Sequence, residues 1–322
     1  MKRITLGLLA ISGLATGASA EELIVTGLSG LVQTIDLDTG VVGHRGVCTG
    51  AVQSMAVADG TLYLGGLLDD VYVFDLATNQ VTGTFTIPGQ AHAMAWTGAQ
   101  LLIANTGSTI ITIDPADHSV IETRSVPTGD ISAIGIDAGG LFVGGQNSLA
   151  LRSPVGMNDF QFFAACGSMI NAMAFGPQRM YLAGTTFFSE DAGTVYTFDK
   201  FVGGVSYTAT FPVPNDAAAI LAHRGLLYVG GSDGLVHEMH AGTGQILRTF
   251  DLMVPVRGIA PAQGLVSCPA DYDISGDLNF FDVALFLNLF SAQLPAADTN
   301  GDGLFDFFDV ARFLDMFNAG CP

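Results

Sequence analysis

A short apolar motif recurs along most of the chain at an interval near 40 residues, and this period constrains the fold more than any other feature. The copies are LIVTG at 23, LYLGG at 62, LLIAN at 101, LFVGG at 141, MYLAG at 180 and LYVGG at 227. A period of roughly 40 residues without long helical patterns accommodates about four short strands per unit. The six units within residues 21–266 therefore predict a six-bladed β-propeller.

The segment before the repeats has the composition of a secretory signal peptide. Lys2 and Arg3 precede an apolar run, and Ala18, Ser19 and Ala20 are the small residues expected before a cleavage site. The apolar run is too short and too rich in glycine for a membrane span. We expect residues 1–20 to be removed and the mature chain to be secreted or associated with the cell surface, without direct membrane insertion.

The charge balance argues against nucleic acid as a partner. The chain has 30 acidic and 11 basic residues, a net charge of -19, and Lys2 and Lys200 are its only lysines. Proteins that bind nucleic acid use cationic surfaces to neutralise phosphates. A chain this acidic is expected to bind something else.

A second strand in each unit closes on a turn, as in TIDLDTG at 34 and VFDLATNQ at 73. Four units place aspartate in the same column, at Asp36, Asp75, Asp114 and Asp199. Aspartate at this place accepts hydrogen bonds from the turn backbone. We expect this structural role for the column, with ligand contact as the alternative.

The LYVGG motif and the D-L-A-T or D-L-D-T-G turns resemble those of the quinoprotein-dehydrogenase-like and YVTN-type propellers. The resemblance implies a fold and not an activity. Quinone-dependent members of that group carry more blades and repeated tryptophan motifs, whereas Trp96 is the single tryptophan here. No quinone cofactor is expected.

Aligning the units on their glycine markers places a polar column at the start of the next strand, which we expect to be innermost in each blade. The column reads Gln53, His92, Ser132, Asn171, Ala218 and Arg257, and two positions earlier come Ala51, Gln90, Asp130, Met169, Asp216 and Pro255. Innermost strands begin near one mouth of a propeller channel, so polar residues from several blades can converge there. The candidate site residues are His92, Asp130, Asn171, Asp216 and Arg257.

This mixed set of side chains suits ligand binding better than catalysis. Metal-dependent hydrolysis would require several carboxylates, and only two aspartates fall in these columns. The sequence also lacks the H-E-x-x-H motif. Two alternatives stay open: polar strand ends that merely hold channel water, and an extracellular hydrolase or lyase that acts on a polysaccharide or a lactone.

Cys48 and Cys166 occupy the same place in the first and fourth units. These units lie opposite each other in a six-membered ring, and a disulfide requires Cα atoms within about 7 Å. We expect both thiols to be free or buried.

The composition changes at the boundary near residue 267. Residues 268–322 contain nine aspartates, a single arginine and nine of the 22 phenylalanines. DYDISGDLNFFDVALFLNLFSA at 271 is followed 27 residues later by DTNGDGLFDFFDVARFLDMFNA at 298. The segment is therefore an internal duplication.

Each half opens with the oxygen-rich spacing of a calcium loop, with a glycine at the sixth position. The first loop would bind through Asp271, Asp273, Ser275, Asn279, Asp282 and the carbonyl of Asp277. The second would bind through Asp298, Asn300, Asp302, Asp306, Asp309 and the carbonyl of Leu304. We expect two calcium ions, the first held less tightly because Ser275 carries no charge. The alternative is a plain helix hairpin with acidic caps.

An apolar pattern of helical period follows each loop, at Val283, Phe286, Leu287 and Phe290 and at Val310, Phe313, Leu314 and Phe317. Pro269 and Pro295 precede the loops closely, so no helix is expected to enter either loop.

Duplicated loop–helix halves without entering helices resemble a dockerin, and CPADYD and NAGCP at the two ends resemble the GC-type dockerin of secreted proteins. The resemblance implies a disulfide between Cys268 and Cys321 and a cohesin-like or other cell-surface receptor as partner. It also implies recognition through loop positions 10 and 11, which are Phe280, Phe281, Phe307 and Phe308. Cellulosomal dockerins carry small polar or hydroxyl residues there, so this chain departs from their pattern. We expect one phenylalanine of each pair to face the core.

The sequence thus predicts a mainly β chain: a signal peptide at 1–20, a six-bladed propeller at 21–266 and a small all-α, calcium-binding, dockerin-like module at 267–322. The predicted function is a secreted propeller that binds a protein or carbohydrate ligand and is anchored or assembled through its calcium-dependent tail. A structural component of a surface layer is a further alternative.

Overall fold

The computed structural model describes residues 21–137, 140–154, 159–176, 178–186, 193–200, 207–214, 216–262, 278–291 and 304–320, and the single residues 270, 272, 297 and 299. The predicted signal peptide lies outside these residues.

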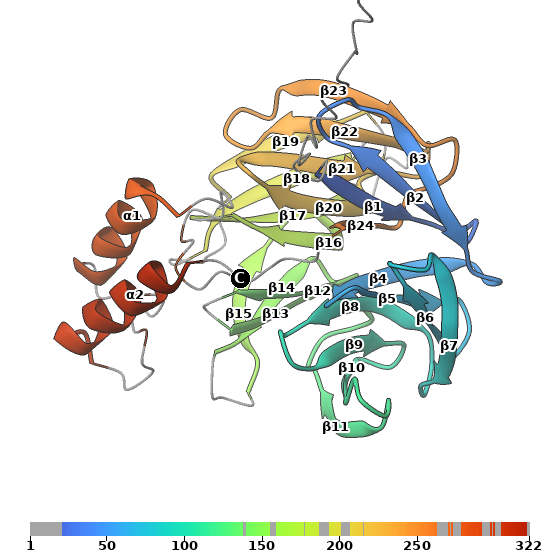
Figure 1. Ribbon diagram of the computed structural model, residues 1–322, viewed down its shortest axis with the longest axis horizontal. Helices are drawn as coiled ribbons and strands as arrows, with labels where there is room; N and C mark the ends of the chain where they lie inside the picture. The colour runs from blue at the N-terminus through green and yellow to red at the C-terminus, as the bar shows by residue number, and fades with distance from the viewer. Residues whose placement is uncertain are drawn as a thin grey trace, which may run out of the picture.

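Six antiparallel sheets of four strands each account for all the described strands (Figure 1). From the innermost strand outward, the first blade contains β24 (Gly258–Pro261), β1 (Glu22–Thr26), β2 (Leu31–Asp36) and β3 (Val42–Val47). The second contains β4 (Val52–Ala58), β5 (Thr61–Gly66), β6 (Asp70–Asp75) and β7 (Gln80–Thr86), and the third β8 (Ala91–Trp96), β9 (Leu101–Asn105), β10 (Thr109–Ile113) and β11 (Val120–Ser125). The fourth contains β12 (Ile131–Asp137), β13 (Gly140–Gly145), β14 (Leu149–Ser153) and β15 (Gln161–Ala165). The fifth contains β16 (Ser168–Phe175), β17 (Arg179–Thr186), β18 (Gly193–Asp199) and β19 (Ala209–Val213), and the sixth β20 (Ala219–His223), β21 (Leu226–Gly230), β22 (Leu235–His240) and β23 (Ile246–Asp251).

The sheets form a closed ring. The innermost strand of each blade contacts that of the next, and the last such contact joins β24 to β4. The first blade combines both ends of the repeat region, because β24 pairs with β1 in register Leu23↔Pro261 to Thr26↔Gly258. The predicted six-bladed propeller is confirmed.

The repeated motifs are the second strands of the blades, and they are buried on both faces. All five residues of β9 are buried, as are five of the six residues of β5. A strand enclosed between two neighbouring blades cannot alternate apolar and polar residues. This explains why the markers are unbroken apolar runs.

Three of the four aspartates in the column, Asp36, Asp75 and Asp114, have the predicted structural role. The Asp36 carboxylate accepts a hydrogen bond from Thr39 N at 2.7 Å, and that of Asp75 accepts from Thr78 N at 2.6 Å. These backbone bonds lower the pKa of both carboxyl groups. Asp114 makes the same kind of contact, because Ala116 N donates to it at 2.8 Å.

One buried histidine carries a polar atom that the propeller does not satisfy. His237, in β22, is 5% exposed, and its Nδ1 lies 3.0 Å from Thr249 Oγ1. Among the described residues, Nε2 is buried without a hydrogen-bond partner. Burial lowers the pKa of His237, so the folded propeller favours the neutral ring.

The substitution His237→Leu is expected to remove an acid-sensitive part of the propeller's stability. Because the folded-state pKa is lowered, the unfolded chain binds more protons once the pH falls below roughly 6.5. The wild-type free energy of unfolding should therefore drop as the pH falls through that value, by at most about 1.4 kcal/mol per pH unit, and level off below the folded-state pKa. Urea denaturation followed by Trp96 fluorescence at about pH 7.5 and about pH 5.5 measures this.

The matched control is His240→Leu, which removes an exposed histidine from the same strand. Wild type and His240→Leu should show the same pH dependence, and His237→Leu a weaker one. An unaltered pH dependence in His237→Leu would contradict the prediction.

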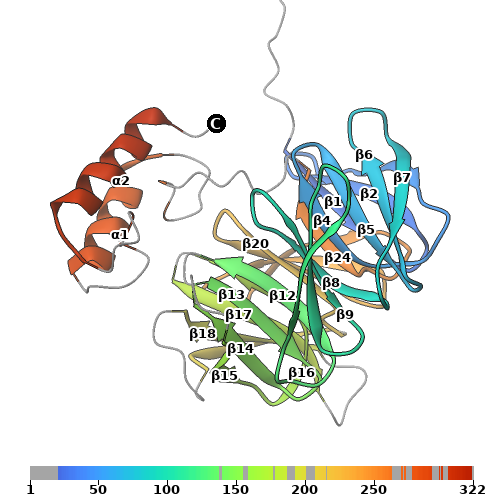
Figure 2. The same ribbon diagram turned by 90° about the horizontal axis from the view of Figure 1, so that it is seen from below.

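The helices α1 (Phe280–Ser291) and α2 (Phe307–Ala319) have a hydrophobic core of their own (Figures 1 and 2). At its centre the rings of Phe286 and Phe313 stack with centroids 4.1 Å apart. Burial raises the pKa of Tyr272, which packs on both rings, to about 12. Within the described part of the chain, neither helix is long and apolar enough to cross a membrane.

The helical prediction is wrong at one position of each repeat. Leu287 and Leu314 are 49% and 50% exposed instead of buried. In α1 the buried leucines are Leu285 and Leu289, which lie on the side of Phe286.

Candidate functional site

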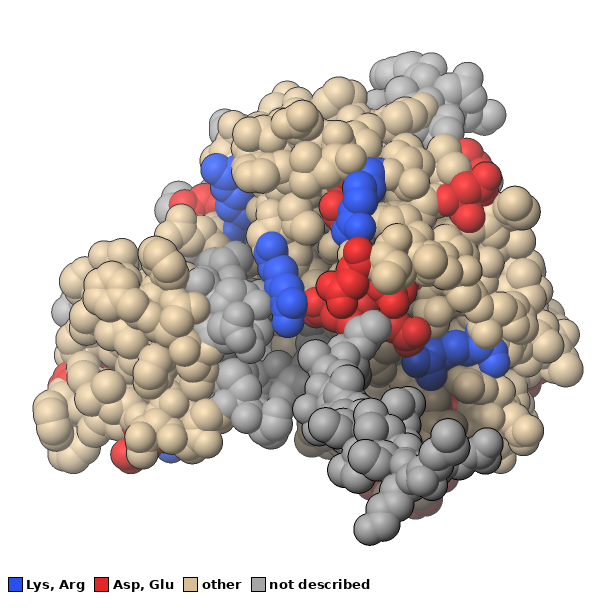
Figure 3. Space-filling model, turned by 45° about the horizontal axis from the view of Figure 1, so that its top comes forward, with Lys and Arg blue, Asp and Glu red and all other residues tan. Residues whose placement is uncertain are grey.

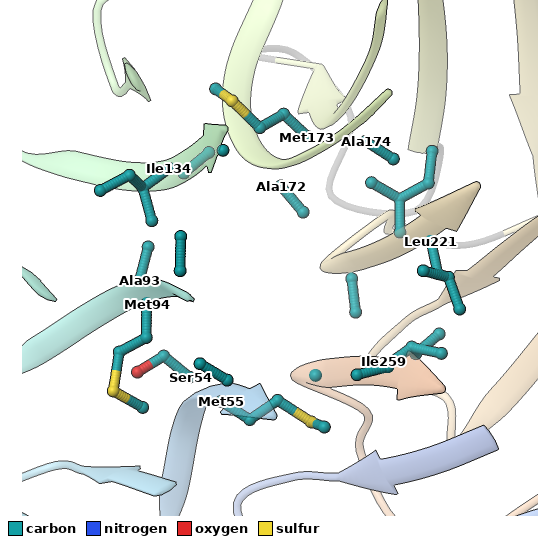
Figure 4. Close-up of a pocket in the computed structure, with 18 of the residues that line it drawn as sticks. Ser54, Met55, Ala93, Met94, Ile134, Ala172, Met173, Ala174, Leu221 and Ile259 are labelled. Atoms are coloured by element: carbon teal, nitrogen blue, oxygen red, sulfur yellow. The ribbon is translucent and has the colours of Figure 1, made fainter. Parts of the chain in front are cut away.

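A cavity of about 320 Å³ runs along the axis of the propeller, and all six blades contribute to its wall. The wall consists of the innermost strands, as the close-up in Figure 4 shows. Each innermost strand is the free edge of its sheet, so its unpaired backbone groups as well as its side chains face the cavity. Such groups require water or a ligand as partner.

The predicted polar column lies in this wall: its six members, Gln53, His92, Ser132, Asn171, Ala218 and Arg257, all line the cavity. In four blades the member of the column is a β-bulge, because the pairing between the first two strands skips Gln53, His92, Ser132 and Asn171. In the other two blades the member of the column is hydrogen-bonded to the second strand: the backbone N–H of Ala218 donates to Gly230 O, and that of Arg257 donates to Thr26 O. A bulge changes the direction of its side chain, so the same backbone irregularity presents the column to the channel.

Three members of the column use their donors within the protein. Gln53 Nε2 donates to Gly66 O at 3.2 Å, Asn171 Nδ2 donates to Thr185 Oγ1 at 3.0 Å and to Ala217 O at 3.2 Å, and Ser132 Oγ donates to Ile170 O. Two of these bonds join neighbouring blades. The amide oxygens of Gln53 and Asn171 can still accept hydrogen bonds from a ligand.

His92 and Arg257 differ from these three residues. Both are half-buried, and neither side chain has a hydrogen bond or an ion pair with any residue that the structure describes. They therefore offer an imidazole and a guanidinium to whatever enters the channel.

The prediction that Asp130 and Asp216 also lie at the site is wrong. Neither lines the cavity. The Asp216 carboxylate accepts from Ser232 N at 2.5 Å and from Ser232 Oγ at 2.6 Å, and Asp130 is exposed. The connecting loops place the backbone carbonyl oxygens of these two residues against Gly145 and Gly231, at the end of the second strand of the same blade, and Asp216 Oδ1 lies close to Gly231 as well.

The sequence analysis did not predict a second ring of cavity-lining residues, which is apolar and lies next to the polar column. Two residues after each member of the column comes a large apolar residue, and these six, Met55, Met94, Ile134, Met173, Ile220 and Ile259, also line the cavity. Several of them and the alanines around them surround the central opening in Figure 4. The recurrence of Met or Ile at one position in all six units was the available signal.

One carboxylate is present among the described residues that line the cavity. Asp137 ends β12, and its Oδ1 lies 3.2 Å from Lys200 Nζ. This ion pair occupies the carboxylate, so the cavity lacks the carboxylate ring that metal-dependent hydrolysis would require.

The two cysteines of the propeller are free, as predicted. Cys48 is buried, its Sγ donates to Gly50 O at 3.1 Å, and burial raises the pKa of its thiol. Cys268 and Cys321 lie outside the described residues.

The second candidate site is formed by the phenylalanine pairs of the helical segment. The prediction that one member of each pair faces the core is wrong, because Phe280, Phe281, Phe307 and Phe308 are 75%, 69%, 75% and 67% exposed. Asp306 is the N-cap of α2, so Phe307 and Phe308 are the first two residues of the helix. The core side of the helix begins at the next residue, Asp309, and continues at Phe313, one turn further on.

The predicted calcium ligands fall partly outside the described residues: Asp271, Asp273, Ser275, Asp277, Asp298, Asn300 and Asp302 are not described. Of the others, Asn279, Asp282, Asp306 and Asp309 stand at equivalent places of the two repeats, and Leu304 is exposed. Asp282 and Asp309 are both fully buried. Asp282 Oδ2 accepts from Asn279 N at 2.8 Å, and Asp309 Oδ2 accepts from Asp306 N at 3.0 Å. These bonds cap the helices.

The surface charge is mixed on the face shown in Figure 3, where basic side chains lie beside acidic ones without an extended basic field. An ion pair between Arg224 Nη1 and Glu21 Oε2, at 2.7 Å, is one of the described charge pairs of the propeller.

Comparison with known proteins supports the fold. No protein-family model and no curated protein matches the chain. Among solved structures, one chain in a crystal structure of a nidogen/laminin complex is similar, with a TM-score of 0.63 and 13% sequence identity over 75% of this chain and 98% of that chain. Similarity at this level of identity shows the propeller fold and no more.

Proposed function

We propose that this chain is a secreted or cell-surface propeller that binds a ligand and is held in place by its C-terminal segment, residues 267–322, which docks onto a protein receptor in a calcium-dependent way. The observation that carries the proposal is the exposure of two phenylalanine pairs at equivalent places of an internal duplication. A cohesin-like receptor is the partner that the resemblance to dockerins implies.

Exposed phenylalanine at this density is unusual for a surface without a partner. The four rings are each at least 67% exposed, and the two rings of each pair lie 6.4 Å apart, centroid to centroid. Burying one such ring against a partner contributes roughly 2 to 3 kcal/mol. Clustered exposed aromatic side chains of this kind mark interaction sites.

The buried aspartates support the calcium requirement. Asp282 and Asp309 stand at the twelfth position of the two predicted loops and are fully buried. A carboxylate charge is costly to bury unless it is hydrogen-bonded and paired with a cation. The twelfth position of a calcium loop supplies such a carboxylate, and the remaining predicted ligands are also hard oxygen donors.

The propeller's part of the proposal is ligand binding. The nidogen/laminin structure is, by its title, that of a complex, and a protein ligand is compatible with it. The cavity wall favours binding over hydrolysis, since its described carboxylate, Asp137, is engaged with Lys200.

Capture of a receptor from the cell-surface fraction tests the docking role. The immobilised full chain is expected to retain a protein in the presence of calcium and to release it when a chelator is added. Replacing all four phenylalanines, Phe280, Phe281, Phe307 and Phe308, with alanine should reduce capture at least about tenfold, because the apolar contact is lost.

The control is the double variant Leu287→Ala and Leu314→Ala, which removes half-exposed leucines from the same two helices. It should capture as wild type does. Docking is contradicted if the phenylalanine variant captures as much protein as this control, or if the chelator leaves capture unchanged.

A further inference from the structure

We infer that the propeller channel binds a small carboxylate with a short apolar chain, and that Arg257 binds the carboxylate group. The inference rests on the proposed ligand-binding role of the propeller and names the chemical class of its ligand. It does not depend on the C-terminal segment.

Arg257 is held in a fixed place at the channel wall. Its backbone N–H donates to Thr26 O at 2.8 Å, and the neighbouring Val256 is 1% exposed. On its other side, a Cβ added to Gly258 would lie 2.4 Å from Met55 Cγ, so the backbone fits closely against the next blade. The guanidinium therefore extends from a rigid base.

The Arg257 guanidinium is not paired with any carboxylate in the described part of the protein. A guanidinium has five N–H donors and stays protonated at any physiological pH. Arg257 is half-buried, and its side chain makes neither a hydrogen bond nor an ion pair with the described residues. A carboxylate matches the two-pronged geometry of these donors.

The carboxylates of the cavity wall and of the loops before the polar column are already engaged or lie outside the cavity. The Asp216 carboxylate is bonded to Ser232, and that of Asp137 is paired with Lys200. Asp130 is exposed and does not line the cavity. These carboxylates weaken the attraction of the channel for anions without neutralising Arg257 directly.

The rest of the wall defines the body of the ligand. Next to the polar column lies the level of Met and Ile residues together with small residues such as Ala93 and Ala172. The cavity volume of about 320 Å³ is at the lower end of the range for ligand pockets. His92 and the amide oxygens of Gln53 and Asn171 can bond a hydroxyl group close to the carboxylate.

The single tryptophan is a reporter for this site, because Trp96 lines the same cavity. The full chain is titrated with acetate, butyrate and hexanoate, and with butylamine and butanol as cationic and neutral probes, at constant ionic strength. We expect a saturable change in Trp96 fluorescence with the carboxylates, stronger binding with the longer chains, and weak or no response to butylamine and butanol.

The variant Arg257→Gln should bind butyrate at least about tenfold more weakly, as expected for the loss of charge-assisted hydrogen bonds. Arg179→Gln is the matched control, since Arg179 is a half-buried arginine that does not line the cavity. The urea midpoints of both variants show whether each remains folded.

Three results would overturn the inference: no saturable response to any carboxylate, an equal response to butylamine or butanol, or binding of butyrate by folded Arg257→Gln within about twofold of wild type. If butanol alone gave a response, the channel would still bind a ligand, but the inference that this ligand is a carboxylate would be wrong. Loss of receptor capture in the phenylalanine variant has no bearing on these outcomes, so the two proposals fail separately.

Discussion

Replacing Asp309 with alanine is expected to unfold α1 and α2 while the propeller stays folded. The carboxylate is fully buried, and its two oxygens accept from the backbone N–H groups of Thr299 and Asp306 at 2.8 Å and 3.0 Å. Each such bond to a charged group contributes roughly 1.5 to 3 kcal/mol, and alanine would leave both donors without an acceptor. A loss of about 3 kcal/mol or more exceeds what a core of this size can withstand.

The full chain allows the two parts to be followed separately. Far-ultraviolet circular dichroism detects the loss of helix, and Trp96 fluorescence reports on the propeller, since Trp96 belongs to β8. Asp315→Ala is the control, because it removes an exposed aspartate from the same helix. If Asp309→Ala melts with the same helical transition as Asp315→Ala, the capping role argued for this carboxylate is incorrect. Under the proposed function, added calcium should raise the helical transition of wild type and not that of Asp309→Ala.

The propeller was predictable because its information is local and repeated. Each unit carries its own apolar strand and its own turn, so a period near 40 residues counts the blades without any knowledge of how they pack. The same markers set the register, which is why His92, Asn171 and Arg257 were aligned correctly with the channel wall. The bulges at His92 and Asn171 have no sequence signal.

Features that depend on backbone direction were not predictable. Asp130 and Asp216 precede the polar column by two residues, and their carbonyl oxygens lie against Gly145 and Gly231, which no residue pattern indicates. In the helices, Phe307 and Phe308 stand beside Asp309 in the sequence. It is the aspartate that points into the core, because the N-cap at Asp306 sets the rotation of the helix. Burial of a carboxylate in preference to two phenylalanines is a tertiary effect.

The glycine found at or near the end of the second strand of most blades is explained by close packing of the backbone. A Cβ added to Gly184 would lie 1.9 Å from the carbonyl oxygen of Met169, which is the residue two positions before Asn171. The same clash, with carbonyl oxygens at 2.2 Å or less, recurs at Gly27, Gly145 and Gly231. No positive φ is involved at these positions. These four glycines are required because the backbone carbonyl two residues before the polar column of the same blade lies directly over them.

The substitution Gly184→Ala is therefore expected to destabilise the propeller by about 3 kcal/mol, at the upper end of the cost of overpacking a tight contact. The obstacle is backbone and cannot move aside as a side chain would. In urea denaturation followed by Trp96 fluorescence, the midpoint should fall well below that of wild type. Met169 lies in β16, two residues before Asn171 and the channel wall, so butyrate binding should also weaken in the folded fraction.

Two other glycines make the prediction specific. Gly83, in β7, has nothing within 4 Å of an added Cβ and no positive φ, so Gly83→Ala should be close to neutral. Gly66 stands in the same column as Gly184, but its closest contact would be 3.1 Å, so Gly66→Ala should lie between the two. The urea midpoint is expected to be highest for Gly83→Ala, lower for Gly66→Ala and lowest for Gly184→Ala. If alanine at Gly184 is tolerated as well as alanine at Gly83, the close approach of the Met169 carbonyl oxygen is not the reason for glycine at this position.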